Sequence, residues 1–276
     1  MRFSEILLIA TTLTGVIWLL DALFLKPRRM MNVISPRGQS VKEPWWVEYS
    51  KSFFPILVVV FLLRSFLAEP FRIPSGSMHP LLLEGDFIIV NKYDYGLRLP
   101  IFDTKLLRVG DPKRGDVIVF KHVDNGESID MIKRVIGLPN DHIQYKNKMV
   151  YINGEPMKQE FIKDTVDMNE RGMIFPVREL IETLGSVKHT IYIHPDLQPS
   201  NYAFDDFIVP SNQYFVMGDN RDNSKDGRMW GFVPDKDIQG RAFGIWMSWD
   251  SITPRAHWWD IFTQGVRWNR LMTPIK

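Results

Sequence analysis

The sequence predicts a mainly β domain that follows two membrane-spanning helices. The long apolar runs are confined to residues 6–69, and the rest of the chain consists of short β-branched or aromatic segments bounded by Gly, Pro, Asn or Asp. The chain has 276 residues, of which 45% are hydrophobic and 24% are charged. About 200 residues remain after the apolar runs, which is enough for one well-packed domain.

The first membrane-spanning helix is expected over residues 1–25. The run 6–20 carries no charge, and it resumes after Asp21, so that about 20 apolar residues are available to cross a bilayer. A cleavable signal peptide is the alternative interpretation. The acidic Glu5 and the lack of a small-x-small cleavage site before Lys26 argue against it.

The second membrane-spanning helix is expected over residues 53–69, where the run FFPILVVVFLL is followed by Arg64 near one end. A buried core strand is the alternative for so short a run. Between the two runs, residues 26–52 contain six basic and two acidic side chains. By the positive-inside rule this segment is a cytoplasmic loop, and residues 70–276 are expected on the outer side of the membrane.

The outer domain contains six segments with the composition of strands. One of them leads into Asn153-Gly154, which is typical of a tight hairpin. By contrast, Val177–Leu184 (VRELIETL) has a helical period and predicts a helix. Residues 155–212 carry no motif, and we interpret them as a surface elaboration. The expected strands are Phe87–Val90, Asp116–Phe120, Met131–Ile136, Met149–Ile152, Tyr214–Met217 and Ala242–Trp246.

The tryptophans are concentrated near the end of the chain, with six of nine in the last 47 residues. Packing in a core explains them most simply. The alternative is that some of them enter the membrane surface, where indole rings prefer to lie. The six residues are Trp230, Trp246, Trp249, Trp258, Trp259 and Trp268.

Composition and motifs exclude several classes of site. Without cysteine there is no disulfide framework, iron–sulfur cluster, cysteine-ligated zinc or cysteine nucleophile. The glycine-rich nucleotide motifs, HExxH and GxSxG do not occur, and a net charge of +2 without a long basic run does not suggest nucleic acid. Asp222–Gly227 begins like a calcium loop, but Val233 stands where the bidentate glutamate is required.

Two segments remain as carriers of chemistry. Pro74–Pro80 (PSGSMHP) predicts a rigid, exposed turn that presents two hydroxyls, although a plain linker has similar composition. In Met131–Gly137 (MIKRVIG), strand alternation places Lys133 between apolar neighbours on one face and Arg134 between apolar neighbours on the other. An edge strand with two snorkelling cations is the alternative for this second segment.

A serine and a lysine can together form a nucleophile and its base. Only lysine can become neutral for this role, because arginine stays protonated at any working pH. At an ordinary pKa of about 10.4, roughly one lysine in 2,500 is neutral at pH 7, but burial can lower that pKa by about 3–5. A Ser–Lys dyad is therefore chemically coherent, although 56 residues separate its members in this sequence.

Five motifs in a fixed order resemble those of bacterial type I signal peptidases (leader peptidases), the membrane-bound serine endopeptidases that remove signal peptides from exported preproteins. This resemblance implies a fold of twisted antiparallel β-sheets, an active site that faces the membrane surface, and no metal or organic cofactor. The motifs are PSGSM at 74–78, GDFIIVNKYDYG at 85–96, RGDVIVFK at 114–121, MIKRVIGLP at 131–139 and GDNRDNSKDGR at 218–228.

Carried over position by position, the resemblance implies Ser77 as the nucleophile and Lys133 as the general base. Ser75 matches the side-chain donor of the oxyanion hole, where one donor is typically worth about 10²–10³ in rate. Ser224 matches the hydroxyl that orients the lysine.

Other matched positions have supporting roles. Asp226 and Arg228 resemble a structural ion pair. The chain departs from the family pattern at Leu81, Asn140 and Gly227, which leaves small changes in pocket shape and loop stiffness open. The residues that match the lining of the pockets for small side chains at −1 and −3 are Ile73, Met78, Leu82 and Ile132.

The resemblance also implies a location in the bacterial cytoplasmic (inner) membrane, with the catalytic domain on the periplasmic side. The expected partners are signal-peptide-bearing preproteins, the lipid bilayer and the protein-export channel, with no nucleic acid. Three alternatives stay open. They are a catalytically inactive, membrane-anchored adaptor of the export machinery, a Ser–Lys protease that cuts its own chain, and a non-enzymatic structural protein of the cell envelope.

Overall fold

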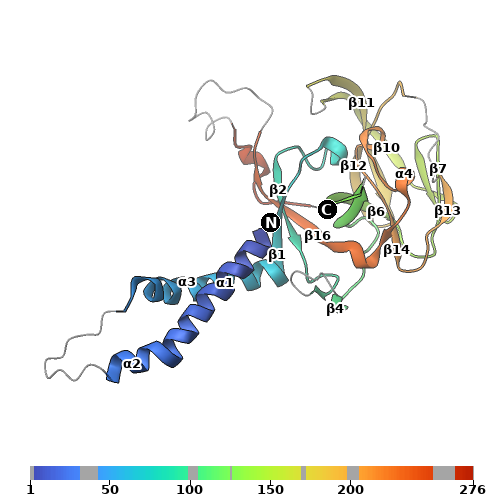
Figure 1. The fold of residues 1–276 in the computed structure, drawn as a ribbon. Coiled ribbons are helices and arrows are strands. Elements are labelled where there is room, and N and C mark those ends of the chain that lie inside the picture. Colours follow the sequence, from blue (N-terminus) through green and yellow to red (C-terminus); the bar gives the residue numbers. More distant parts are fainter. Residues whose placement is uncertain are drawn as a thin grey trace. The chain divides into compact units, whose positions relative to one another are not determined.

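The computed structural model describes residues 3–31, 43–98, 105–124, 126–168, 172–197, 205–250 and 265–275. The chain forms two compact units, which are Met1–Ala68 with Arg98–Leu106, and Glu69–Leu97 with Leu107–Lys276 (Figure 1). The first unit contains two apolar helical stretches and the second is mostly antiparallel sheet, which confirms the predicted fold class.

Each helical stretch contains a window long and apolar enough to cross a bilayer, Glu5–Met30 with mean hydropathy 2.1 and Trp45–Leu67 with mean hydropathy 1.7. The second run is helical, so the alternative of a buried strand is wrong. Both stretches extend into the segment expected as a loop at 26–52. The helical segments are α1 (Phe3–Leu20), η1 (Asp21–Leu25), α2 (Lys26–Met31), α3 (Trp45–Leu62) and η2 (Leu63–Leu67).

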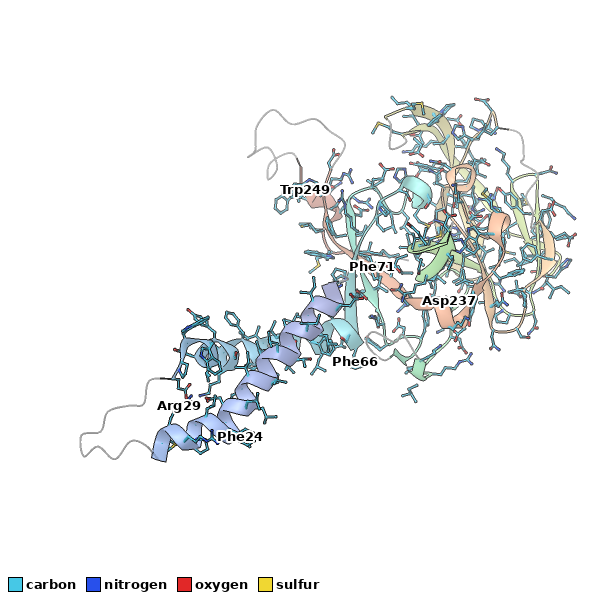
Figure 2. All side chains as sticks on the ribbon, viewed as in Figure 1. Phe24, Arg29, Phe66, Phe71, Asp237 and Trp249 are labelled. Carbon is cyan, nitrogen blue, oxygen red and sulfur yellow. The ribbon has the colours of Figure 1, made fainter. Side chains whose placement is uncertain are left out.

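Helices α1 and α3 pack against each other at a glycine. A side chain at Gly15 would meet the Phe54 ring at 2.6 Å, and the same ring lies 5.3 Å from Trp18 between centroids. In the first helical stretch, Phe24 of η1 is exposed, and Arg29 lies in the helix α2 that follows it (Figure 2). Arg29 pairs with the buried Asp21 at 2.7 Å, as a carboxylate inside an apolar helix requires.

The second unit is built on an eight-stranded sheet, counted over the described residues, with the order β1-β2-β16-β5-β6-β14-β15 and β17 paired to β16. Two smaller sheets have the orders β10-β11-β12 and β13-β7-β8-β9 (Figure 1). The strands are β1 (Ala68–Arg72), β2 (Asp86–Asn91), β3 (Leu97–Arg98), β4 (Lys105–Leu107), β5 (Val117–Asp124), β6 (Glu127–Gly137), β7 (His142–Lys146), β8 (Met149–Ile152), β9 (Glu155–Pro156), β10 (Gln159–Met168), β11 (Ile174–Leu184), β12 (Val187–Ile193), β13 (Asp206–Ile208), β14 (Gln213–Met217), β15 (Val233–Pro234), β16 (Ile238–Ser248) and β17 (Thr273–Pro274).

All six expected strands are present, as β2, β5, β6, β8, β14 and β16. The hairpin between β8 and β9 is also confirmed, because Asn153 and Gly154 both adopt positive φ, at 53° and 85°. Short helical turns connect the strands. They are η3 (Gly76–Met78), η4 (Arg221–Asn223), α4 (Gly227–Trp230), η5 (Asp235–Asp237) and η6 (Trp268–Arg270).

The predicted helix over Val177–Leu184 is wrong, because these residues form most of β11. This strand pairs with β10 on one edge and β12 on the other, so its backbone groups are satisfied by neighbouring strands rather than along the segment. Such tertiary pairing overrides local helical propensity. Part of the 155–212 segment reaches the interior, since Asp167, Glu182 and His189 are buried.

The described tryptophans include both core and surface residues. Trp230 packs on the buried Phe120 with ring centroids 5.8 Å apart. Trp246 and Trp268 are 38% and 62% exposed, respectively. Two others, Trp258 and Trp259, lie outside the described residues.

Asp86 at the start of β2 connects three distant parts of the domain. Its buried carboxylate accepts hydrogen bonds from the Ser248 hydroxyl (2.6 Å), the Arg270 Nε (3.1 Å) and the backbone N–H of Leu83 (2.8 Å). Arg270 also donates to the carbonyl of Leu81 at 2.8 Å. The loop before β2 is thereby fixed to β16 and to the C-terminal turn η6.

We predict that Asp86→Ala lowers the free energy of unfolding by about 3–5 kcal/mol, because it leaves the Arg270 guanidinium and two further donors without their buried acceptor. Thermal unfolding of the detergent-solubilised full chain measures this loss. Asp164→Ala is the matched control, since that carboxylate is 73% exposed in a surface pair with Arg178. Equal melting temperatures for the two variants would contradict the prediction.

Candidate active site

The turn that carries the predicted nucleophile is largely buried rather than exposed. Gly76, Met78 and His79 are buried, while Ser75 and Ser77 are half-buried. Met78 has no exposed surface because it inserts into the apolar cluster beneath the turn. The interpretation of this segment as a plain linker is therefore wrong.

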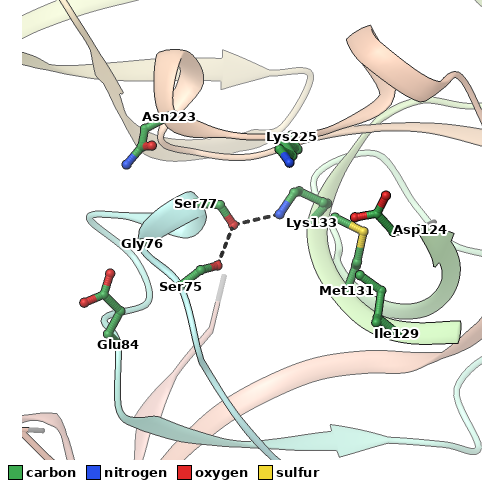
Figure 3. A pocket seen from close by; sticks show the side chains of 10 residues that line it. All are labelled: Ser75, Gly76, Ser77, Glu84, Asp124, Ile129, Met131, Lys133, Asn223 and Lys225. Carbon is green, nitrogen blue, oxygen red and sulfur yellow. Dashed lines mark hydrogen bonds between the residues drawn. The ribbon is translucent and has the colours of Figure 1, made fainter. Parts of the chain in front are cut away.

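The structure brings Ser77 and Lys133 together. Lys133 Nζ lies 2.7 Å from Ser77 Oγ and donates to the carbonyl of Ile132 at 2.9 Å. The Ser75 hydroxyl donates to Ser77 Oγ at 3.4 Å (Figure 3). The 56-residue separation is closed because Met78 beneath the turn and Ile132 next to the lysine belong to the same apolar cluster.

The Lys133 side chain is buried, with 3% of the residue exposed. Burial lowers the pKa of Lys133 to about 8, although the carboxylates of Asp226 and Asp219 raise it, and the guanidinium of Arg228 lowers it further. At that value about one lysine in ten is neutral at pH 7, which is enough to supply a base.

Arg134, next to the lysine in sequence, lies on the opposite face of β6 and is also buried. Its guanidinium holds both carboxylate oxygens of Asp219, at 2.8 and 2.7 Å, and donates to the carbonyl of Gly115 at 2.7 Å. Because β6 pairs with β5 on one side and β14 on the other, the alternative of an edge strand with two snorkelling cations is wrong.

Asp226 and Arg228 form a buried, two-pronged ion pair behind the lysine, with N–O distances of 2.9 and 2.8 Å. Asp226 also accepts from the backbone N–H of Gly218 at 3.0 Å and caps the short helix α4. Burial alone would raise the pKa of Asp226, but the charge and hydrogen bonds of Arg228 hold it below its usual value.

The Ser224 hydroxyl makes no hydrogen bond among the described residues, so the expected contact with Lys133 is not formed in this structure. The hydroxyl instead lies against Gly218, and the carbonyl of Ser77 lies against the same face of this glycine, where a Cβ would stand. A side chain at Gly218 would overlap with both groups. This glycine therefore allows the segment that holds Ser224 to approach the nucleophile.

A cavity of about 570 Å³ opens over the Ser77–Lys133 pair. The four predicted pocket residues, Ile73, Met78, Leu82 and Ile132, do not line it, because they are packed in the apolar cluster below. Ile129 and Met131 share the strand face of Lys133 and form an apolar wall (Figure 3). The lining residues are Ser75, Gly76, Ser77, Glu84, Asp124, Ile129, Met131, Lys133, Asn223 and Lys225.

Sequence reasoning missed most of this lining. Strand alternation had already placed Met131 beside Lys133, and one further step backwards would have found Ile129. No local signal identifies Glu84, Asp124, Asn223 or Lys225, because Asp124 ends β5, the other three lie in loops or turns, and all four reach the cavity only once the sheets are assembled. Within the described ranges, no group of three His, Cys, Asp or Glu could hold a metal ion.

The chain matches the family model described as "Signal peptidase, peptidase S26" over residues 46–249. It is 43% identical to signal peptidase I of Pseudomonas aeruginosa, with 90% of this chain and 93% of that protein covered. It is 36% identical to signal peptidase I of Haemophilus influenzae, with 99% of this chain and 92% of that protein covered. A crystal structure of a signal peptidase I from Enterococcus faecalis is 28% identical, covers 48% of this chain and 97% of that one, and has a TM-score of 0.30.

The family match covers most of the chain, and the relatives match over nearly their whole length. The Ser77–Lys133 pair lies within the matched residues. The chain therefore belongs to the signal peptidase family, peptidase S26.

Proposed function

We propose that this protein is a membrane-bound serine endopeptidase that removes N-terminal signal peptides from exported preproteins, with Ser77 as nucleophile and Lys133 as general base. The observation that carries the proposal is the buried Lys133 amine, 2.7 Å from the Ser77 hydroxyl. The name of the relatives, signal peptidase I, supports the substrate class.

The reaction begins with neutral Lys133, which takes the Ser77 proton while Ser77 Oγ forms a bond to the scissile carbonyl carbon. The carbonyl of Ile132 accepts one amine hydrogen, which leaves the nitrogen lone pair free to face Ser77. The resulting ammonium gives its proton to the leaving amine as the peptide bond breaks. The neutral lysine then takes a proton from water, whose oxygen attacks the acyl-enzyme ester. The ammonium returns this proton to Ser77 Oγ as the ester bond breaks, which restores the free serine and the neutral lysine.

Two donors stabilise the negative oxygen that forms in each tetrahedral intermediate. They are the backbone N–H of Ser77 and the hydroxyl of Ser75, which lies beside the nucleophile at 3.4 Å. We assign Ser224 the task of orienting the neutral amine. Its buried hydroxyl makes no hydrogen bond among the described residues, so it is available to bond to the Lys133 amine.

We attribute the expected preference for small residues at −1 and −3 to the packed apolar cluster beneath the cavity. Substrate side chains at these positions meet a surface whose underlying residues are tightly packed and cannot recede. A small residue fits without displacing them, whereas a large one does not. These underlying residues, which do not themselves line the cavity, are Ile73, Met78, Leu82 and Ile132.

The two apolar helices anchor the protein in a membrane. We assign it to the bacterial cytoplasmic membrane, with the basic 26–52 segment inside and the catalytic residues on the periplasmic side. Preproteins that emerge from the protein-export channel would reach the site there while their signal peptides are still in the bilayer.

We predict that Ser77→Ala and Lys133→Met each lower cleavage of a preprotein with an Ala-x-Ala site by at least about 10⁴-fold. Both detergent-solubilised variants are expected to keep the melting temperature of the wild type. Lys133→Met keeps an apolar side chain of similar length and removes only the buried amine. Of the two variants it is therefore the better test that activity is lost without unfolding. Wild-type cleavage by either folded variant would overturn the dyad, whereas a folded wild type that does not cleave would favour the inactive adaptor.

We predict that the cleavage rate rises with pH through about 8, because only the neutral form of Lys133 is a base and deprotonation occurs above its pKa. Arg228→Met should move this rise to higher pH, since it removes a cation that lowers the pKa and leaves Asp226 unpaired to raise it. In the double variant Asp226→Asn/Arg228→Met both charges are removed, so the pH at which the cleavage rate rises should return toward that of the wild type.

Single-turnover rates between pH 5 and pH 10 measure these shifts, and Arg228→Lys is the control that keeps the charge. A wild-type profile whose rise lies near 10 would contradict the role of burial. An Arg228→Met profile that coincides with the wild type would contradict the role of the ion pair.

A further inference from the structure

Three buried side chains that the proposed dyad does not use meet beneath the nucleophile turn. They are His79 from the turn, Asp167 from β10 and Asn220 from the segment after β14, and we call them the turn clamp. Asp167 accepts a hydrogen bond from His79 Nδ1 at 2.7 Å through one carboxylate oxygen, and from Asn220 Nδ2 at 2.6 Å through the other. Each of the three residues is less than one tenth exposed.

Asn220 holds the peptide groups on both sides of the nucleophile. Its side-chain Nδ2 donates to the carbonyl of Gly76 at 3.0 Å, and its backbone N–H donates to the carbonyl of Ser77 at 3.1 Å. One residue therefore fixes the two peptide planes that determine where Ser77 points.

The orientation of the Gly76–Ser77 peptide has a direct chemical consequence. In a planar trans peptide, the C=O and N–H groups point in opposite directions. Because Asn220 holds the Gly76 carbonyl on the buried side, the N–H of Ser77 is directed to the other side, where Gly76 and Ser77 line the cavity (Figure 3). This N–H is the backbone donor of the proposed oxyanion hole.

The remaining members of the clamp keep the Asn220 amide in that orientation. A primary amide has two N–H groups, and here one is used by Gly76 and the other by Asp167. Burial would raise the pKa of Asp167, but the hydrogen bonds from His79 and Asn220 hold it below its usual value, so the acceptor is a carboxylate. A rotated amide would turn its oxygen toward this anion.

We propose that Asn220, held by Asp167 and His79, is a positioning residue that aims the Ser77 N–H at the oxyanion. The inference rests on the proposed function of Ser77 and Lys133. Asp167 lies in the three-stranded sheet of the 155–212 segment. Through Asp167, that sheet would help to position the backbone donor of the oxyanion hole.

The first test compares Asp167→Ala with Asp167→Asn in preprotein cleavage by the detergent-solubilised full chain. The side chain in Asp167→Asn can accept from Asn220 through its oxygen and donate its N–H to His79 Nδ1, provided that the ring carries its proton on Nε2. The kcat of this variant should therefore stay within about threefold of the wild type. The Asp167→Ala variant lacks the carboxylate that holds the Asn220 amide, and its kcat should fall by about 10–100-fold. This loss is smaller than the factor of about 10²–10³ that follows removal of an oxyanion-hole donor. Neither variant should change KM or the pH near 8 at which the cleavage rate rises, because the substrate contacts and Lys133 are unaltered.

The second test is the double variant Asn220→Asp/Asp167→Asn, which reverses the hydrogen bond between the two side chains but leaves the Gly76 carbonyl without a donor. We expect a melting temperature close to that of the wild type with kcat still lowered by about 10–100-fold. A clamp that served stability alone would recover activity together with the melting temperature.

Three results would overturn the inference: wild-type kcat in Asp167→Ala, recovered kcat in the double variant, or a loss of kcat accompanied by a shifted pH profile. If the double variant does not fold, the comparison of Asp167→Ala with Asp167→Asn decides. Wild type and Ser77→Ala in the same assay keep the two proposals apart. An inactive wild type would refute the proposed function, whereas an active wild type with unaffected clamp variants would refute only the positioning role.

Discussion

Burial of the Lys133 amine is the constraint on which the rest of the site depends, because a base must be neutral to accept the proton of Ser77. The centre of the large sheet supplies the burial, since β6 is covered on both edges by β5 and β14. The nearby carboxylates of Asp219 and Asp226 favour the ammonium, but burial has the larger effect on the pKa of Lys133. Each of these carboxylates also has its own arginine partner, and the charge of Arg228 lowers the pKa of Lys133 further.

The same requirement explains why so many charges lie inside a small β domain. Buried ion pairs are costly unless their geometry is good, and here each arginine contacts its carboxylate through two nitrogen atoms. A third pair, Arg221–Glu182, ties β11 to the segment after β14. Burial and the two neighbouring arginines lower the pKa of His189 well below its usual value, so this ring between the pairs stays neutral.

Local patterns in the sequence predicted the strands and the depressed pKa of Lys133, because both depend on immediate neighbours in the chain. Short β-branched and aromatic runs bounded by turn residues identify β5 and β6, and the apolar neighbours of Lys133 predict its burial. The helix expected at 177–184 failed because pairing with two distant strands decided the conformation of that segment. The turn clamp was missed for the same reason, since Asp167 and Asn220 meet only after the sheets have assembled.

The sequence Ser75-Gly76-Ser77 acquires a physical explanation from the clamp. Two serines are needed for the hydroxyls, but the glycine between them does not adopt a positive φ, so backbone freedom is not the reason for it. Its role is close approach, because a side chain at Gly76 would lie 2.9 Å from the ring of His79. Any larger residue would push this ring away from Asp167, loosen Asn220, and turn the peptide that carries the Ser77 N–H. The requirement for glycine is therefore set by the packing behind the turn, while the chemistry takes place in front of it.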